Sequence, residues 1–377
     1  MDPLRLAAFG LDPAVVHLNH GAYGVAPVSV RKAAEAWRDR AERNPHRFNR
    51  VDLPGLIAAA RERAARFLGV EAERVGWLRN VSEGVSAVLG SLTLSPGDEL
   101  VASSHGYGAV GKALEHHARR FGARVVEAAF PVGATDQTVI EAYAACCGPR
   151  TRLVVVDRIT SPTATVLPVA GVTAAVAAVS EAAVLVDAAH APGHLDEGPE
   201  GIAGLGATYW IGNLHKWAYT PRGTAMLWVA PGAEVAPTVL SWQLEDGFAQ
   251  AFDYPGTWDY AGWLASGAGL DFWSGLGGWD EVGRHAALVA EGQRRLADAL
   301  GTSLAGLPPA PAPAMRLVRL PAGVADSLER ANDLYERLSR AGAEVAPVVQ
   351  DGVGYLRIAA AAYNTVEDYD RLATLIV

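Results

Sequence analysis

Short apolar runs alternate with helical patterns through the first two thirds of the chain, and this alternation restricts the possible folds more than any other feature. Four runs have the length and composition of buried strands: 99–103, 124–128, 152–156 and 183–187. Helical stretches separate them, at 105–121, 138–146 and 169–180. Strands connected through helices predict an α/β fold, in which a mostly parallel sheet is covered by helices on both faces. Ligands of such sheets bind beyond the carboxyl ends of the strands, where Asp157 and Asp187 lie.

The C-terminal third follows a different pattern. It is mainly helical over 258–300, and a segment rich in proline and alanine, 307–314, then leads into a strand, a helix, two strands and a last helix. This order predicts a small α+β domain. We expect the following parts: an N-terminal arm and loop over the active site (1–50), a large ligand-binding domain (51–257), inter-domain helices (258–300) and a small C-terminal domain (301–377).

The chain is acidic and poor in cysteine. Its 41 acidic and 32 basic residues give a net charge of −9, so no basic surface favours nucleic acid or an anionic membrane. The two cysteines, Cys146 and Cys147, are adjacent, which excludes a disulfide framework and is typical of a reducing compartment. The sequence begins without the layout of a signal peptide. Its uncharged stretch 159–180 contains Pro162 and Pro168, so we expect a soluble helix there and no membrane span. These features predict a cytoplasmic protein with a small-molecule substrate.

Lysine is almost absent from this chain, because arginine fills every basic position except Lys32, Lys112 and Lys216. An arginine cannot lose its proton near neutral pH and attack a carbonyl carbon to form a Schiff base, whereas a lysine can. Lys32 and Lys112 lie in charged helical stretches. Lys216 lies between His215 and Trp217, just before an apolar strand. We therefore predict Lys216 as a reactive amine, against the alternative that it is a lysine retained by chance.

Asp187 ends an aliphatic run and would be a buried carboxylate, which needs a cation nearby. A structural arginine is one candidate for that cation, and a protonated pyridine nitrogen is another. The presence of Lys216 favours the pyridine nitrogen as the cation that pairs with Asp187. A Schiff-base lysine and an aspartate on the ring nitrogen are the two groups that a pyridoxal 5'-phosphate (PLP) site most requires. In this interpretation PLP is the electron sink, and Lys216 also moves the proton of the substrate α-carbon.

A phosphate anchor is predicted where a turn enters a helix at Asn80-Val81-Ser82. The Ser82 hydroxyl and the neighbouring amides, that of Val81 included, would face an anion at a helix N-terminus. An ordinary helix-capping role for Ser82, with Glu83 in the first turn, explains the same residues.

A glycine motif offers a competing hypothesis. Residues 106–111 match G-x-G-x-x-G after a strand, and Glu127 follows in the next strand, as in a dinucleotide site. The nicotinamide interpretation leaves Lys216 and Asp187 without a role. In the PLP interpretation Tyr107, within the motif, would stack on the pyridine ring.

Four segments together resemble a known family: 17–31, 184–193, 206–228 and 355–372. They are similar to fold-type I PLP-dependent enzymes of the class V aminotransferase superfamily, in the isopenicillin N epimerase-like branch, which has cysteine desulfurases and natural-product C–S lyases as relatives. The resemblance implies a large domain with a mostly parallel sheet, a small C-terminal α+β domain, PLP as cofactor, and a homodimer with shared active sites.

The resemblance also implies roles around the pyridine ring. Lys216 would form the Schiff base, and Asp187 would hold the ring nitrogen. His190 would lie near the phenolic oxygen of PLP, Tyr107 would stack on the ring, and Ser161 would lie in a loop over the cofactor edge.

Further roles concern the phosphate and the substrate. Phosphate contacts are expected from Ser82, Asn213 and His215, beside the amide of Val81. Thr257 matches a threonine that reaches the phosphate in the neighbouring subunit. Arg357 matches the arginine that binds the substrate α-carboxylate with both nitrogens, and Asn19 and Tyr23 belong to a loop that closes over the site.

The reaction is predicted less directly. Cysteine desulfurases of this family need a cysteine late in the chain, and none follows Cys147, so persulfide formation is not expected. We expect β-elimination of a sulfur conjugate, that is, a C–S lyase of secondary metabolism. Epimerase, aminotransferase and decarboxylating deaminase activities remain alternatives, as does a non-catalytic PLP-fold binding protein. We expect the tryptophan-rich region 241–279 to line the substrate pocket or to form a dimer interface or an inter-domain core.

Overall fold

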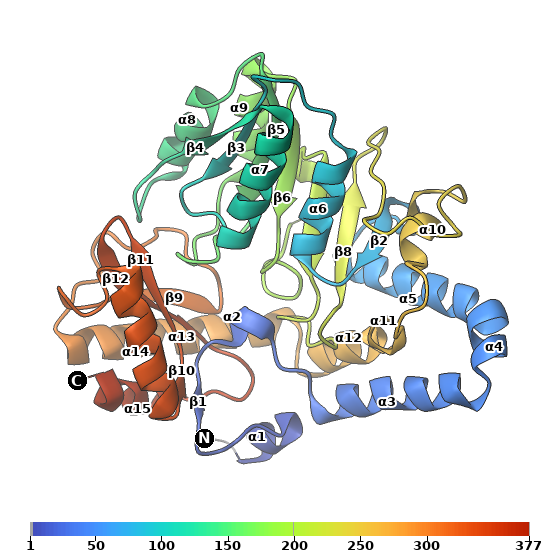
Figure 1. The fold of residues 1–377 in the computed structure, drawn as a ribbon. Coiled ribbons are helices and arrows are strands. Elements are labelled where there is room, and N and C mark those ends of the chain that lie inside the picture. The colour runs from blue at the N-terminus through green and yellow to red at the C-terminus, as the bar shows by residue number, and fades with distance from the viewer. Residues whose placement is uncertain (1–2, 199, 377) are drawn as a thin grey trace.

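A seven-stranded sheet forms the centre of the larger part of the molecule (Figure 1). The computed structural model describes residues 3–198 and 200–376. The strands lie in the order β2 (Val75–Leu78), β8 (Ala225–Val229), β7 (Tyr209–Asn213), β6 (Ala183–Asp187), β5 (Thr151–Asp157), β3 (Glu99–Ser103) and β4 (Arg124–Ala128). Neighbours from β4 to β7 are parallel, while β8 runs antiparallel to both β7 and β2. The four predicted strands and the mostly parallel sheet are thus confirmed.

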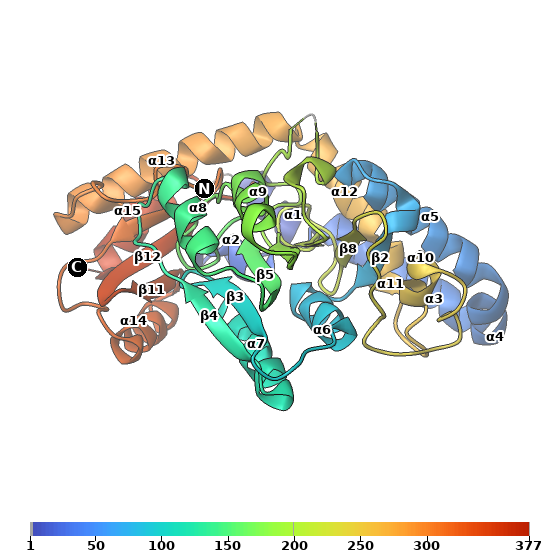
Figure 2. The same ribbon diagram turned by 90° about the horizontal axis from the view of Figure 1, so that it is seen from above.

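Helices cover both faces of this sheet. One face carries α5 (Leu53–Leu68), α8 (Asp136–Ala145) and α9 (Val169–Val179), and the other carries α6 (Val81–Ser91) and α7 (Gly108–Phe121). Figure 2 shows α8 and α9 on one side of the strands and α6 and α7 on the other. Side chains of β5 alternate between the two faces: Val154 and Val156 pack on the first, Leu153 and Val155 on the second. Burial on both faces explains why the strand runs are apolar throughout.

The helix predicted over 105–121 begins later than expected. In the structure, residues up to Tyr107 form a turn closed by a hydrogen bond from the Gly106 N–H to the Ser103 carbonyl, and α7 begins at Gly108. His105 cannot extend the helix because its buried ring bonds elsewhere, to Thr163 Oγ1 and to the Phe130 carbonyl.

A second, smaller unit lies beside the large sheet. It holds a three-stranded antiparallel sheet in the order β11 (Ala346–Gln350), β12 (Val353–Ala359) and β9 (Met315–Arg319). Its helices are α13 (Trp279–Leu300), α14 (Leu328–Arg340) and α15 (Val366–Ile376). The predicted order of strand, helix, two strands and helix is therefore present. Apolar side chains from all these elements form one cluster, to which β11 contributes a partly buried residue and the others buried ones.

The N-terminal segment joins this smaller unit. Strand β1 (Val16–His17) pairs in parallel with β10 (Ala343–Glu344), and Val16 and Leu18 lie in the same apolar cluster. The chain then passes between the two units as α2 (His20–Tyr23) before it enters α3 (Val28–Arg43) (Figure 1). Residues next to α2 therefore lie close to both units.

The remaining helices are short or flank the large unit. They are α1 (Pro3–Phe9), α4 (Pro45–Arg47), η1 (Phe48–Asp52), η2 (Ala72–Arg74), η3 (Ala203–Leu205), α10 (Phe248–Asp253), α11 (Ala261–Leu264) and α12 (Ser266–Gly275). Among the described helices, none combines the length and the apolar character that a bilayer crossing requires.

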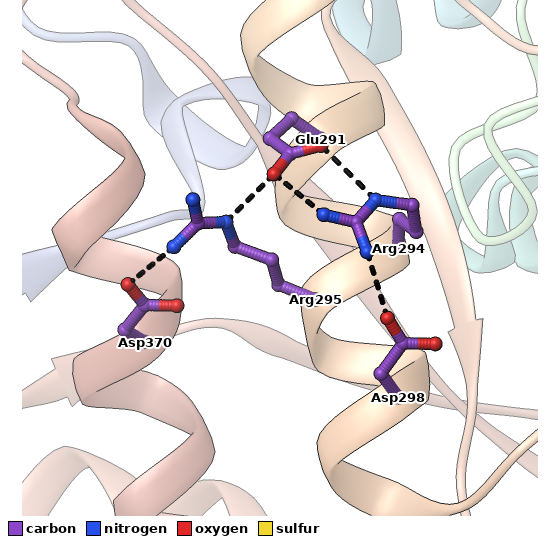
Figure 3. Close-up of polar contacts among 5 residues, drawn as sticks. All are labelled: Glu291, Arg294, Arg295, Asp298 and Asp370. Atoms are coloured by element: carbon purple, nitrogen blue, oxygen red, sulfur yellow. Dashed lines mark hydrogen bonds and ion pairs between the residues drawn. The ribbon is translucent and has the colours of Figure 1, made fainter.

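Exposed ion pairs lie along α13, and one of them connects α13 with α15 (Figure 3). Glu291 accepts hydrogen bonds from Arg294 and Arg295, and Arg295 also donates to Asp370 of α15, at 2.8 Å. Arg294 donates in addition to Asp298. All five side chains are open to solvent, so each pair stabilises the fold little, and the buried cluster beneath them holds the helices together.

Candidate active site

A cavity of about 300 Å³ opens at the carboxyl ends of β5, β6 and β7, beside the N-terminus of α6. Its walls include most of the residues predicted for the site: Tyr23, Val81, Ser82, Tyr107, Ser161, Asp187, His190, Asn213, His215 and Lys216. Asn19, Arg357 and Thr257 are not among its lining residues. The cavity lies where ligands of parallel sheets bind.

Lys216 follows β7 in a buried turn, with only 8% of its surface exposed. Its Nζ lies 3.2 Å from Nε2 of His190, and its carbonyl accepts a hydrogen bond from Nε2 of His20, at 2.9 Å. Burial, helped by the charge of Arg357 and opposed by that of Asp187, lowers the pKa of Lys216 to about 7. A large share of the amine is therefore unprotonated near neutral pH, as a nucleophile requires.

Asp187 ends β6 and is 3% exposed. Its Oδ1 accepts a hydrogen bond from the Ala189 N–H, at 3.0 Å. Burial raises the pKa of Asp187, while that hydrogen bond and the charge of Lys216 act in the opposite direction. Within residues 3–198 and 200–376, no arginine forms an ion pair with this carboxyl group, so the structural arginine considered from the sequence is not found there. A positively charged group of a ligand could therefore pair with Asp187 in the cavity.

His190 lies in the turn that follows β6 and is fully buried. One ring nitrogen, Nε2, contacts Lys216, but Nδ1 is buried without any hydrogen-bond partner in the described part of the chain. Burial lowers the pKa of His190 well below its usual value, so the ring is neutral. A buried ring nitrogen without a partner is costly unless a ligand supplies one. The phenolic oxygen of PLP would satisfy it.

The N-terminus of α6 forms another wall of the cavity. Asn80 is its capping residue, with its Oδ1 accepting from the Glu83 N–H at 3.0 Å. The capping role considered for Ser82 is therefore wrong, since Ser82 lies inside the first turn and its exposed side chain lines the cavity. Asn213, at the end of β7, accepts from the Val81 N–H at 3.1 Å. Because the Val81 N–H is bonded to Asn213, the helix dipole and the Ser82 hydroxyl are the features here that suit a phosphate.

His215 lies on the same side of the cavity. Its Nδ1 hydrogen-bonds to the Thr224 carbonyl at 3.1 Å, and burial lowers its pKa to about 4. A neutral imidazole whose Nδ1 donates to a carbonyl retains Nε2 as an acceptor. Arg222 also lines this part of the cavity and donates to the Gly24 carbonyl, at 3.1 Å.

Arg357 extends from β12 of the small unit toward the large one. Its Nη1 donates to the carbonyl and the hydroxyl of Ser161, and its Nη2 donates to Oδ1 of Asn19, at 2.8 Å. Burial lowers the pKa of Arg357 to about 10, so it remains a cation at neutral pH. In the described part of the chain, its hydrogen bonds all go to uncharged oxygen atoms. A buried guanidinium with neutral neighbours is suited to bind a carboxylate.

Replacement of Arg357 by lysine should reduce apparent substrate affinity by about 10–100-fold, because an ammonium group keeps the charge and loses the two parallel hydrogen bonds. Steady-state kinetics would show this as a higher KM, while the absorption of bound PLP stays unchanged. Arg319→Lys, on the adjacent strand β9, is the matched control. An unchanged KM in Arg357→Lys would mean that the substrate carboxylate is bound elsewhere.

Two tyrosines and the tryptophan-rich region lie at or beyond the edge of the site. Tyr23 and Tyr107 are exposed and line the cavity. Thr257 is exposed too, but outside the cavity of its own chain. No tryptophan of 241–279 lines that cavity within the described chain. Trp242, 91% exposed, is the most open of them.

Sequence reasoning did not assign a role to Asp157, which lies beside Asp187 in the cavity wall. Both residues carry the same signal, a carboxylate at the end of a buried strand. Arg79, Asn80 and Arg222 also line the cavity and were not predicted, because polar residues in turns are common for reasons unrelated to ligands.

Solved structures share the fold of this chain. C-DES, a cystine C–S lyase solved with its reaction product cysteine persulfide, matches with a TM-score of 0.81 at 21% identity, over 97% of this chain and 98% of its own. A C-DES lysine-to-alanine mutant with glycine covalently linked to the PLP cofactor matches with a TM-score of 0.80 at 21% identity, over 99% and 98%. These likenesses show a shared fold, that of fold type I, and the family match given next makes the protein a PLP-dependent enzyme.

The chain belongs to the aminotransferase class-V family, whose model matches residues 27–372. Isopenicillin N epimerase of Streptomyces clavuligerus is 33% identical, over 96% of this chain and 94% of that protein. A probable chloroplastic L-cysteine desulfhydrase of Arabidopsis thaliana is 29% identical, over 97% and 83%. The predicted fold, family and cofactor are confirmed, and the nicotinamide and non-catalytic alternatives are wrong.

Proposed function

We propose that this enzyme is a C–S lyase that releases sulfur from cysteine or a cysteine S-conjugate by β-elimination. The similarity to L-cysteine desulfhydrases along nearly the whole chain supports this choice of reaction. The cavity supports it too, because it places a buried amine, a buried carboxyl group and a nearby buried guanidinium where an amino acid can be bound and deprotonated.

No thiol of this chain is suited to receive the sulfur. Both cysteines lie at the end of α8, where Sγ of Cys146 donates to the Glu127 carbonyl, and neither lines the cavity. Burial raises the pKa of Cys147 to about 11, so it is a poor nucleophile. The sulfur would therefore leave as a free thiol or sulfide.

Bound in this cavity, PLP supplies an electron sink for the α-carbon of the substrate. Lys216 would hold PLP and then take the α-proton on its Nζ. Asp187 would keep the ring nitrogen protonated, and Arg357 would bind the α-carboxylate. The bond from the β-carbon to sulfur breaks with its electron pair on sulfur. In sum, one cysteine S-conjugate and one water give a thiol, pyruvate and ammonia.

Epimerisation is the second candidate, because isopenicillin N epimerase is 33% identical to this chain. It needs the same binding groups and the same first proton transfer, followed by return of a proton to the opposite face of the α-carbon. The identity to that enzyme also supports a proposed role in secondary metabolism.

The test is incubation of the purified, PLP-loaded enzyme with cysteine and a series of S-alkyl and S-aryl cysteines. A lyase should yield equal amounts of pyruvate and free thiol without an added keto acid. Product that forms only with a keto acid would indicate an aminotransferase, and release of carbon dioxide would indicate a decarboxylating deaminase. In deuterium oxide, return of the substrate with exchanged α-hydrogen and scrambled configuration would replace the lyase proposal by the epimerase.

We also propose a cytoplasmic homodimer in which Thr257 contributes to the active site of the partner. Both cysteines are free, as in a reducing compartment. Leu240, Trp242 and Trp258 are large apolar side chains exposed in the single chain, and Trp258 directly follows Thr257; exposed side chains of this kind are found at protein interfaces. Light scattering should give twice the 39.6 kDa mass of one chain. A monomer that binds PLP fully would contradict this assembly.

A further inference from the structure

Two carboxyl groups, not one, lie beneath the cavity. Asp157 ends β5 and Asp187 ends β6, and these residues are direct partners in the parallel pairing of the two strands. Paired residues of neighbouring parallel strands lie about 5 Å apart and direct their side chains to the same side. Each is only 3% exposed, and both line the cavity.

Two buried carboxylates this close cannot both stay ionised, because each charge repels the other where water does not screen it. Burial raises the pKa of Asp157 well above its usual value, and the charge of Asp187 raises it further. Asp187 has the charge of Lys216 to stabilise its ionised form, besides the Ala189 N–H. The negative charge of the pair therefore resides on Asp187, and the proton on Asp157.

The surroundings of Asp157 are consistent with a neutral carboxylic acid. Ser103, at the end of β3, is buried, and its hydrogen bond to the Asp157 side chain favours the ionised form, but burial and the charge of Asp187 act more strongly in the opposite direction. Among the described residues, Asp187 and Tyr143 are the ionisable groups that interact with Asp157, and burial keeps the Tyr143 phenol neutral. In the described part of the chain, no lysine or arginine contacts Asp157.

We propose that Asp157 is a positioning residue that stays protonated and donates a hydrogen bond to the Asp187 carboxylate, so that the pair presents one negative charge to the PLP ring nitrogen. The inference rests on the proposed role of Asp187. With a single anion opposite a single cation, the two carboxyl groups and the ring nitrogen together carry no net charge, which two carboxylates would not allow. A neutral donor beside Asp187 also fixes the orientation of its carboxylate, as outer hydrogen-bond partners do for metal ligands.

The experiment compares Asp157→Asn, Asp157→Leu and Asp187→Asn. Asparagine has the shape of aspartate and keeps a donor without a charge. Asp157→Asn should therefore retain PLP affinity and kcat to within about threefold. Leucine has nearly the same size and no donor, and should reduce kcat by about 10–100-fold. Asp98→Asn, at the opposite end of the sheet beside Arg152, controls for the loss of a buried carboxyl group.

The readouts are the dissociation constant of PLP from the apo-protein and the absorption of bound PLP as a function of pH, besides kcat. The PLP spectrum of Asp157→Asn should follow that of the native protein across pH, while Asp157→Leu should shift it. If Asp157→Asn loses as much as Asp187→Asn, Asp157 is itself ionised and the proposal is overturned. Native kinetics and spectra in Asp157→Leu would overturn it as well.

If Asp187→Asn proves harmless, the proposed role of Asp187 fails, and that result is distinct from either outcome at Asp157. The binding and spectral readouts do not depend on which reaction the enzyme catalyses, so they test Asp157 even if the lyase proposal is wrong.

Discussion

Alanine in place of Lys216 should reduce turnover by more than about 10³-fold, because the enzyme loses both its covalent attachment to PLP and the base for the α-proton. Borohydride reduction of the native enzyme followed by peptide mass spectrometry should show PLP fixed to Lys216. The same treatment of Lys216→Ala should leave the protein unlabelled. Steady-state kinetics with the substrate identified by the proposed test of cysteine and its S-conjugates gives the loss in kcat.

The pH dependence of PLP attachment offers a second readout of the same residue. Only the unprotonated amine attacks PLP, and burial lowers the pKa of Lys216 to about 7. The rate of attachment to apo-protein should therefore rise from pH 6 to about 8 and then level off. An ordinary lysine would keep the rate rising beyond pH 9.

Lys112→Ala is the matched control, because Lys112 lies on α7 outside the cavity. It should leave labelling and turnover unchanged. Borohydride labelling of Lys112 or Lys32 in the native enzyme would show that Lys216 does not hold the cofactor.

Asparagine in place of Asp187 should leave the fold and part of the PLP affinity, yet reduce kcat by about 10²–10⁴-fold. A neutral amide cannot keep the ring nitrogen protonated, and the neutral ring is a poorer electron sink. The loss should appear in kcat, whereas KM should change little, because Arg357 and not Asp187 binds the substrate carboxylate in the proposed mechanism.

Circular dichroism and the absorption of bound PLP would verify that Asp187→Asn is folded and loaded. Asp98→Asn again serves as control for the removal of a buried carboxyl group. Near-native kcat in Asp187→Asn would mean that Asp187 has a structural role only.

Local sequence patterns were sufficient to predict the central strands and the reactive lysine. Burial on both faces makes β5 and β6 apolar runs that end in a carboxylate, and the same topology brings Asp157 and Asp187 to one edge. Lys216 was visible because lysine is so rare in this chain. These patterns depend on residues that are close together in the sequence, so they can be recognised without a structure.

Tertiary contacts were beyond such reasoning. Arg357 meets Ser161 and Asn19 only after two units and the N-terminal segment have packed together. The resemblance to a family, and no local pattern, pointed to these residues. The start of α7 was misplaced because the tertiary hydrogen bonds of His105 overrode the helical pattern around it.

The pairing of β1 with β10 has a consequence for the order in which the protein matures on the ribosome. At about 5–20 residues per second, the roughly 330 residues between Val16 and Ala343 take on the order of 20–60 s to synthesise. The large sheet can form during that interval, but Val16 has no strand partner until β10 emerges. Asn19 and His20, which follow β1, are therefore synthesised early but reach their final positions only after β1 has paired with β10. The active site should acquire its final shape, and its affinity for PLP, only after β10 has emerged and paired with β1.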